Sequence, residues 1–110
     1  MYTVKPLPEF DAWFDTLKDH ATRARLTRRL EKAAMGLLGD VEPVGEGVFE
    51  MREFFGPGWR MYYVKQGDVL IVMLGGGTKD TQSRDIKRAK ALAVLLTATQ
   101  DGKTEPENPR

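Results

Sequence analysis

The chain has 110 residues, no cysteine and one histidine, His20, which excludes disulfides and thiolate chemistry and argues against a histidine-rich zinc site or a Ser-His-Asp triad. Apolar residues make up 41% of the chain and charged residues 30%, as is typical of one small domain with a single core. The net charge is +1, but residues 20–90 hold 13 lysines and arginines against 9 acidic residues, so this basic middle permits contact with nucleic acid.

The hydropathy pattern predicts neither a membrane span nor a secretory segment. No apolar run approaches the roughly 20 residues that a bilayer-spanning helix needs. The first residues, MYTVKPLPEF, also lack the apolar segment of a secretory signal. We therefore expect a cytoplasmic protein without a membrane partner.

The N-terminal segment predicts a short strand and then a helix. Residues 2–5 are β-prone, and Pro6 and Pro8 follow them. Proline ends a strand because it cannot donate to the ladder, yet it suits the first turn of a helix. One apolar face then recurs at helical spacing through Phe10, Trp13, Phe14 and Leu17.

A second helix is predicted from about His20 to Leu38, with Asp19 as its N-cap. Its apolar stripe consists of Leu26, Leu30, Ala33 and Leu37. The short connection between the two helices predicts a helical hairpin whose apolar stripes pack together on a sheet. The basic residues from Arg23 to Lys32 are expected to form a solvated face.

Residues 40–47 are rich in proline and glycine and are expected to form a loop. Three strands are predicted after this loop, at residues 48–54, 59–65 and 69–74. The first two alternate between apolar and polar side chains, as half-buried strands do. The third is apolar throughout, which is typical of a central strand buried on both faces.

The register of the first two of these strands follows from their apolar faces, which must coincide. That requirement places Arg52 and Arg60 together on the opposite face, beside Tyr62. A slip of one residue would bury an unpaired arginine, at a prohibitive cost. We therefore expect the face that carries the two arginines to be open to solvent. In the turn between the strands, Gly56 and Gly58 are expected to supply positive φ angles.

The run Gly75-Gly76-Gly77 is expected to end the last strand as a flexible exit, which lets Lys79 reach the rim of the open face. The run lacks the spacing of a phosphate loop, so binding of a nucleoside triphosphate is not predicted. A third helix is predicted from Gln82 to about Thr97. Residues 98–110 are polar and contain two prolines, and they are expected to form a disordered tail.

Two interpretations of the arginines are open at this point. Either arginine alone is explained by a surface ion pair with Glu50, Glu53 or Asp68, and such pairs contribute little. That explanation weakens when both arginines share one face with an aromatic side chain and a downstream lysine. Guanidinium groups bind phosphate oxygens bidentately, and an exposed aromatic ring stacks on a nucleobase. The pattern then indicates a phosphate-binding face.

Three segments, taken together, resemble the RelE/ParE toxin superfamily and within it the HigB-like addiction module killer proteins. The segments are GVFEMR at 47–52, GPGWRMYY at 56–63, and GGGTKDTQ at 75–82 followed by Asp85-Ile86. The resemblance covers about residues 2–97. It implies an α+β, RelE-like fold in a single domain over residues 1–97, in which an N-terminal strand and a helical hairpin pack on a small, mainly antiparallel sheet with a C-terminal helix.

The resemblance also implies the toxin of a type II toxin–antitoxin system. Such a toxin is a metal-independent endoribonuclease that uses no cofactor and cuts mRNA on the ribosome. Its partner would be a cognate antitoxin, in this branch often a helix-turn-helix protein. Arg52 and Arg60 match basic motif positions and would stabilise charge on the reacting phosphate, and Lys79 would transfer a proton. The residues predicted to bind RNA are Tyr62, Gln82 and Arg84.

The chain departs from the family pattern in one respect. Many relatives transfer a proton through a tyrosine or histidine near the C-terminus, and this sequence has neither after Lys79. The general base is therefore unassigned. Two other functions stay open: a ParE-like inhibitor of DNA gyrase that cuts no RNA, and an inactive homologue that binds only its antitoxin.

Overall fold

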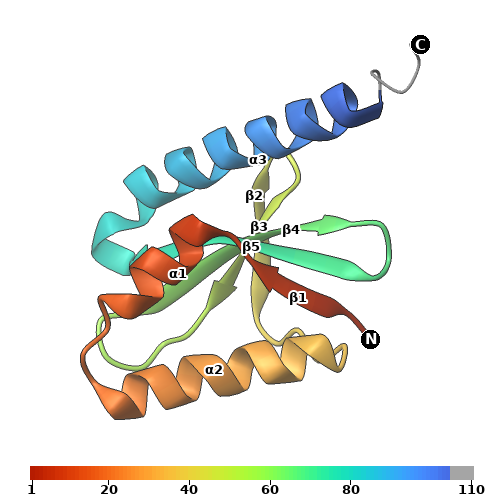
Figure 1. The fold of residues 1–110 in the computed structure, drawn as a ribbon. Coiled ribbons are helices and arrows are strands. Elements are labelled where there is room, and N and C mark those ends of the chain that lie inside the picture. The colour runs from red at the N-terminus through yellow and green to blue at the C-terminus, as the bar shows by residue number, and fades with distance from the viewer. Residues whose placement is uncertain (105–110) are drawn as a thin grey trace.

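The computed structural model describes the backbone of residues 1–104 and the side chains of residues 1–98. The described residues form an α+β protein in which three helices pack on a five-stranded mixed sheet (Figure 1). In chain order the elements are β1 (Thr3–Pro6), α1 (Pro8–Asp15), α2 (His20–Ala34), β2 (Val41–Gly45), β3 (Val48–Arg52), β4 (Trp59–Gln66), β5 (Leu70–Thr78), the short 3-10 helix η1 (Lys79–Thr81) and α3 (Gln82–Thr104).

The strands lie in the order β1-β5-β4-β3-β2. Strand β1 runs parallel to its neighbour β5, and the other three pairings are antiparallel. The expected strands near residues 2–5, 48–54, 59–65 and 69–74 are confirmed. The loop expected at residues 40–47 is wrong, because β2 occupies most of it. This strand lies at the edge of the sheet, where Pro43 is tolerated because one side of an edge strand needs no ladder donor.

Each face of the sheet is covered by helix. Helices α1 and α2 cover one face with a core that includes Phe10, Leu26, Met51, Met61 and Tyr63. Helix α3 covers the other face with a core that includes Val48, Tyr62, Val72, Leu74 and Ala89. Figure 1 shows α2 and α3 on opposite sides of the sheet. We refer to the two sides as the α1/α2 face and the α3 face.

The predicted register is confirmed, because Met51 pairs with Met61 and Arg52 pairs with Arg60. The prediction that the arginine face is open is wrong. Helix α3 packs on that face, and it leaves Tyr62 only 1% exposed and Arg60 only 4% exposed. The physical reason is that α3 has an apolar side of its own, and the α1/α2 face was already occupied.

The glycine run lies inside β5 and is paired with β4, so the expected flexible exit is wrong. A Cβ atom on Gly76 would lie 2.5 Å from the ring of Trp13 in α1. A Cβ atom on Gly77 would overlap the carboxylate of Asp85 in α3. Glycine at these positions therefore allows helices to approach the strand closely from both sides.

Two helix ends differ from the prediction. Helix α2 ends at Ala34 rather than near Leu38, because Gly36 adopts a left-handed conformation with φ of 90° and terminates it. Helix α3 continues to Thr104, beyond the expected end at about Thr97. The rest of the predicted tail, residues 105–110, lies outside the described residues. None of the described helices has the length and apolar character that crossing a membrane requires.

The solvated face expected on α2 is wrong at Arg29, which is 8% exposed. Its guanidinium group donates hydrogen bonds to the backbone carbonyls of Leu38, Asp40 and Arg52, at 2.7 to 3.1 Å. It also pairs with the carboxylate of Glu53 at 2.5 Å. Arg29 therefore fixes the backbone just before β2 begins and at the residue where β3 ends.

Candidate functional site

The three cations predicted from the sequence, Arg52, Arg60 and Lys79, lie around the loop that joins β3 to β4. We call these three residues the basic cluster. Arg52 and Arg60 face each other across the two strands. A Cβ atom built on Gly58 would lie 3.3 Å from Cβ of Lys79 and 3.6 Å from Nη1 of Arg60, so these two side chains both border Gly58. The structure therefore brings the cluster together.

The loop between β3 and β4 has the geometry that its glycines predict. Gly56 and Gly58 have φ angles of 58° and 81°, which confirms the expected positive values. Phe54 projects from this loop and is 68% exposed. The Cζ atoms of Arg52 and Arg60 each lie 5.6 Å from the centre of its ring, within the range of a cation–π interaction.

Arg52 is the more accessible arginine, and 30% of its side chain is exposed. Its Nη2 donates a hydrogen bond of 3.1 Å to Asp40, which raises the pKa of the Arg52 guanidinium. The acidic partner is thus Asp40 and none of the three suggested by the sequence. The pair is surface-exposed and worth little, so it leaves the Arg52 charge free to engage a ligand.

Arg60 is buried beneath the loop. Its Nη1 donates long hydrogen bonds of 3.4 Å to the carbonyls of Glu53 and Trp59. Its Nε lies 3.8 Å from a carboxylate oxygen of Glu50. In the part of the chain that the structure describes, this Nε is buried without a hydrogen-bond partner. Arg60 is therefore held by weak contacts, and its charge is opposed mainly by one buried acid.

Glu50 is the centre of a buried polar network under the first turn of α3. The side chain is 2% exposed. One carboxylate oxygen accepts hydrogen bonds from the hydroxyl of Tyr62 at 3.1 Å and from the amide of Gln82 at 2.7 Å. The same oxygen is the one nearest to Arg60. We call Glu50, Tyr62, Gln82 and Arg60 the Glu50 network.

Two of the predicted RNA-binding residues therefore belong to this network. Tyr62 is buried, so the prediction that it stacks on a base is wrong. Burial and the neighbouring carboxylate of Glu50 raise the pKa of Tyr62, which keeps its hydroxyl protonated. Gln82 is half-buried and directs its amide inward to Glu50 rather than toward solvent.

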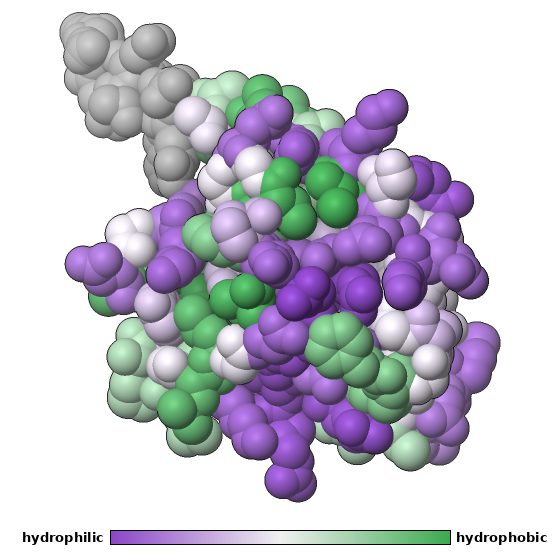
Figure 2. Space-filling model, turned by 180° about the vertical axis from the view of Figure 1, so that it is seen from behind, coloured by the Kyte–Doolittle hydropathy of each residue, from purple (hydrophilic) through white to green (hydrophobic). Residues whose placement is uncertain are grey.

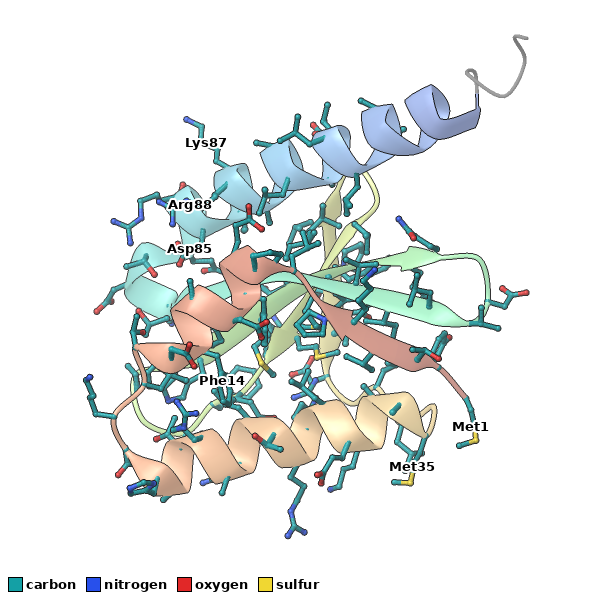
Figure 3. The ribbon with its side chains drawn as sticks, viewed as in Figure 1. Met1, Phe14, Met35, Asp85, Lys87 and Arg88 are labelled. Carbon is teal, nitrogen blue, oxygen red and sulfur yellow. The ribbon has the colours of Figure 1, made fainter. Side chains whose placement is uncertain are left out.

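Arg84, the third residue predicted to bind RNA, is at the surface, and 67% of its side chain is exposed. Its Nε lies 3.7 Å from the carboxylate of Asp85. Asp85 is buried and accepts a hydrogen bond from the hydroxyl of Thr81. Figure 3 shows Asp85 on the side of α3 that faces the sheet and Lys87 pointing away from it. Arg84 and Lys87 border a depression of about 440 Å³ beside η1.

The sequence interpretation missed three features of this site. Phe54 was not predicted, because it falls at the end of the expected strand 48–54 and no local pattern shows that its ring projects into solvent. Glu50 was seen only as an ion-pair partner. Arg29 was assigned to a solvated face.

The face of the molecule turned away from the viewer in Figure 1 is largely hydrophilic, with separate small hydrophobic patches (Figure 2).

The fold and the site together define an α+β protein with a basic cluster at one end of its sheet. No family model and no solved structure matches the chain. The chain is 40% identical over 93 residues to a protein of Haemophilus influenzae that is described as uncharacterized. That match covers 84% of this chain and 94% of the other protein, so the chain belongs to the family of this Haemophilus influenzae protein.

Proposed function

We propose that the protein is the toxin of a type II toxin–antitoxin system and that it cleaves mRNA on the ribosome. The observation that carries this proposal is the convergence of Arg52, Arg60 and Lys79 around one loop. Cations gathered in this way suit a phosphodiester, whose cleavage builds up negative charge at phosphorus. The resemblance of three sequence segments to HigB-like toxins supports the same conclusion.

The proposed reaction is the attack of a ribose 2′ oxygen on the adjacent phosphorus. The bond from phosphorus to the 5′ oxygen breaks, which leaves a 2′,3′-cyclic phosphate and a free 5′ hydroxyl group. Arg52, the more accessible arginine, would bind the phosphate oxygens, and the buried Arg60 would stabilise their charge from beneath the loop. Lys79 is exposed and would donate a proton to the departing 5′ oxygen, and the proton of the 2′ hydroxyl would pass to water.

The Glu50 network gives Arg60 a defined role in this proposal. An arginine that makes only long hydrogen bonds of 3.4 Å has a positive charge that these contacts neutralise little, so its field can act on a phosphate bound at the loop. The carboxylate of Glu50 would hold the guanidinium in place from below. Glu50 is thus a positioning residue, because the proposal assigns it no contact with the phosphate.

The remaining parts of the proposal concern the fold and the partner. A five-stranded mixed sheet with helices on both faces is compatible with a RelE-like fold, and we include that fold in the proposal. The partner would be a cognate antitoxin, a helix-turn-helix protein that masks the basic cluster. The antitoxin would be encoded beside the toxin gene.

The burial of Tyr62 favours a second candidate function. A buried Tyr62 cannot exchange a proton with a bound RNA, although it follows Arg60 closely in β4. The one histidine of the chain, His20, lies at the start of α2. A protein without a strong base would suit a ParE-like role as a gyrase inhibitor, or the role of an inactive homologue that binds only its antitoxin.

Induced expression in bacterial cells separates these functions. We expect the wild-type protein to halt growth and to leave cleaved transcripts that primer extension maps within translated regions. Lys79→Ala should reduce this cleavage at least about tenfold, because the proton donor is lost. The matched control is Lys32→Ala, which removes another exposed lysine, from α2.

The other outcomes decide between the alternatives. Uncut transcripts and unaffected translation in cells that express the wild-type protein would refute the ribonuclease proposal. A DNA-damage response without mRNA cleavage would select the gyrase inhibitor. Normal growth during strong expression would favour the inactive homologue.

A further inference from the structure

We propose that Phe54 is a stacking platform for an unpaired nucleobase of RNA. The inference rests on the proposed function and goes beyond it, because it names the structural class of the substrate and the residue that recognises it. Its starting point is an aromatic ring that the fold leaves in solvent beside two arginines.

Phe54 stands apart from the other large apolar side chains at the surface. Among the residues whose side chains the structure describes, the large exposed hydrophobics are Met1, Met35, Leu37, Phe54, Val69, Val94 and Leu95. Phe54 is the aromatic member of this set. Its neighbour Phe55 is less exposed, and the guanidinium of Arg25 lies 3.8 Å from its ring centre, nearer than either arginine lies to the ring of Phe54. The ring of Phe54 is therefore the more accessible of the two.

The position of the ring relative to the arginines makes it suitable for a nucleotide. Both guanidinium carbons lie 5.6 Å from the ring centre. A nucleobase and its phosphate are joined through one ribose, so a base that stacks on Phe54 brings its phosphate toward the basic cluster. The ring would thereby position the phosphate while the cations neutralise it.

The chemistry of stacking sets the class of ligand. Every base has a π face, so an aromatic platform binds bases with little preference for sequence. A base paired within a duplex cannot offer a face to the ring unless it leaves the stack, which is unfavourable. The platform therefore favours single-stranded RNA over double-stranded RNA.

The test measures the affinity of the purified protein for a short, fluorescently labelled single-stranded RNA that carries 2′-O-methyl groups to prevent cleavage. The variants are Phe54→Leu, which keeps an apolar side chain without the ring, and Phe54→Tyr, which keeps the ring. We expect Phe54→Leu to weaken binding by about tenfold, the order of one lost base–aromatic stack, and Phe54→Tyr to stay within about twofold of wild type.

A second oligonucleotide with abasic positions makes the test specific. It should bind the wild-type protein about tenfold more weakly than the complete RNA, and it should bind Phe54→Leu as it binds wild type. Equal affinity of wild type and Phe54→Leu for the complete RNA would overturn the inference. A loss of similar size on the abasic RNA would also overturn it, because the ring would then act on the backbone or on the protein's own structure.

The two proposals can fail separately. Transcripts that are cleaved in cells, combined with RNA affinity that does not depend on Phe54, would overturn the platform and leave the ribonuclease proposal standing. RNA binding that depends on Phe54, combined with uncut transcripts in cells, would overturn the ribonuclease proposal and leave the platform standing. A wild-type protein with no affinity for unpaired RNA would overturn the platform directly.

Discussion

Both faces of the sheet are covered by helices, but the side chains buried on the two faces differ in kind. The α1/α2 face is packed with apolar side chains along β3, β4 and β5. The α3 face is apolar around Leu74 and Ala89 but carries the Glu50 network near the start of the helix. The first face stabilises the fold, and the charge that α2 buries, Arg29, is paired with Glu53. The second face buries Glu50, whose carboxylate lies beside Arg60 of the basic cluster. Burial alone therefore does not separate structural residues from candidate functional ones.

The largest expected effect comes from the α1/α2 face. Met61 is 0% exposed, and Met61→Ala should lower the free energy of unfolding by about 2–5 kcal/mol, because it removes buried atoms and leaves a cavity. Chemical denaturation measures this change. The control Val94→Ala, at a position that is 61% exposed, should change stability by about 0.5 kcal/mol or less. A small loss for Met61→Ala would contradict the assignment of this face to stability.

The next effect concerns the Glu50 network. Glu50→Gln keeps the shape of the side chain but removes the charge opposite Arg60, and the free energy of unfolding should fall by about 1–3 kcal/mol. Denaturation measures this loss, and transcript cleavage should fall with it because Arg60 is no longer held. The matched control is Glu46→Gln at an exposed position. Unchanged stability and cleavage would show that the network is dispensable.

A smaller effect is expected at high pH. The pKa of Tyr62 is raised in the folded protein, so the folded state keeps a proton that the unfolded chain loses above about pH 10. The free energy of unfolding should therefore fall as the pH rises above that value, by up to about 1.4 kcal/mol per pH unit for one such group. Denaturation at several alkaline pH values measures the slope.

Tyr62→Phe serves as the comparison, because it has no hydroxyl to titrate. Its stability should depend less steeply on pH above about pH 10, and the remaining slope should include Tyr63, whose pKa burial also raises. A slope identical to that of wild type would mean that the Tyr62 hydroxyl is not protected in the folded state.

The smallest effect belongs to the surface pair of the basic cluster. Asp40→Asn should leave the free energy of unfolding almost unchanged, since the pair with Arg52 is exposed to solvent. Transcript cleavage should be retained, because the substitution leaves the Arg52 charge in place. Primer extension and denaturation test the two halves of this prediction. A loss of cleavage comparable to that of Lys79→Ala would show that Asp40 positions Arg52.

Much of the sheet could be predicted from the sequence because period-two alternation and the cost of a buried charge fix the register. The same reasoning correctly placed Arg52 opposite Arg60. It failed on the α3 face, because an alternating polar residue looks the same whether it meets water or a buried partner. The partners of Glu50 come from β4 and α3, and no local pattern shows such a distant set. Strand β2 was missed because its proline and glycine are residues typical of loops.

The pairing of β1 with β5 also has a consequence for the order of events during synthesis. Thr3 lies beside Leu70 in parallel register, so the first strand of the chain has its partner near the end of the domain. A nascent chain cannot complete its sheet until β5 has emerged from the ribosome, and contacts of such long range slow folding. Gln82, which completes the Glu50 network, emerges later still. A chain truncated before α3 would therefore carry Glu50 and Arg60 without the amide of Gln82 and without the helix that packs over this face of the sheet.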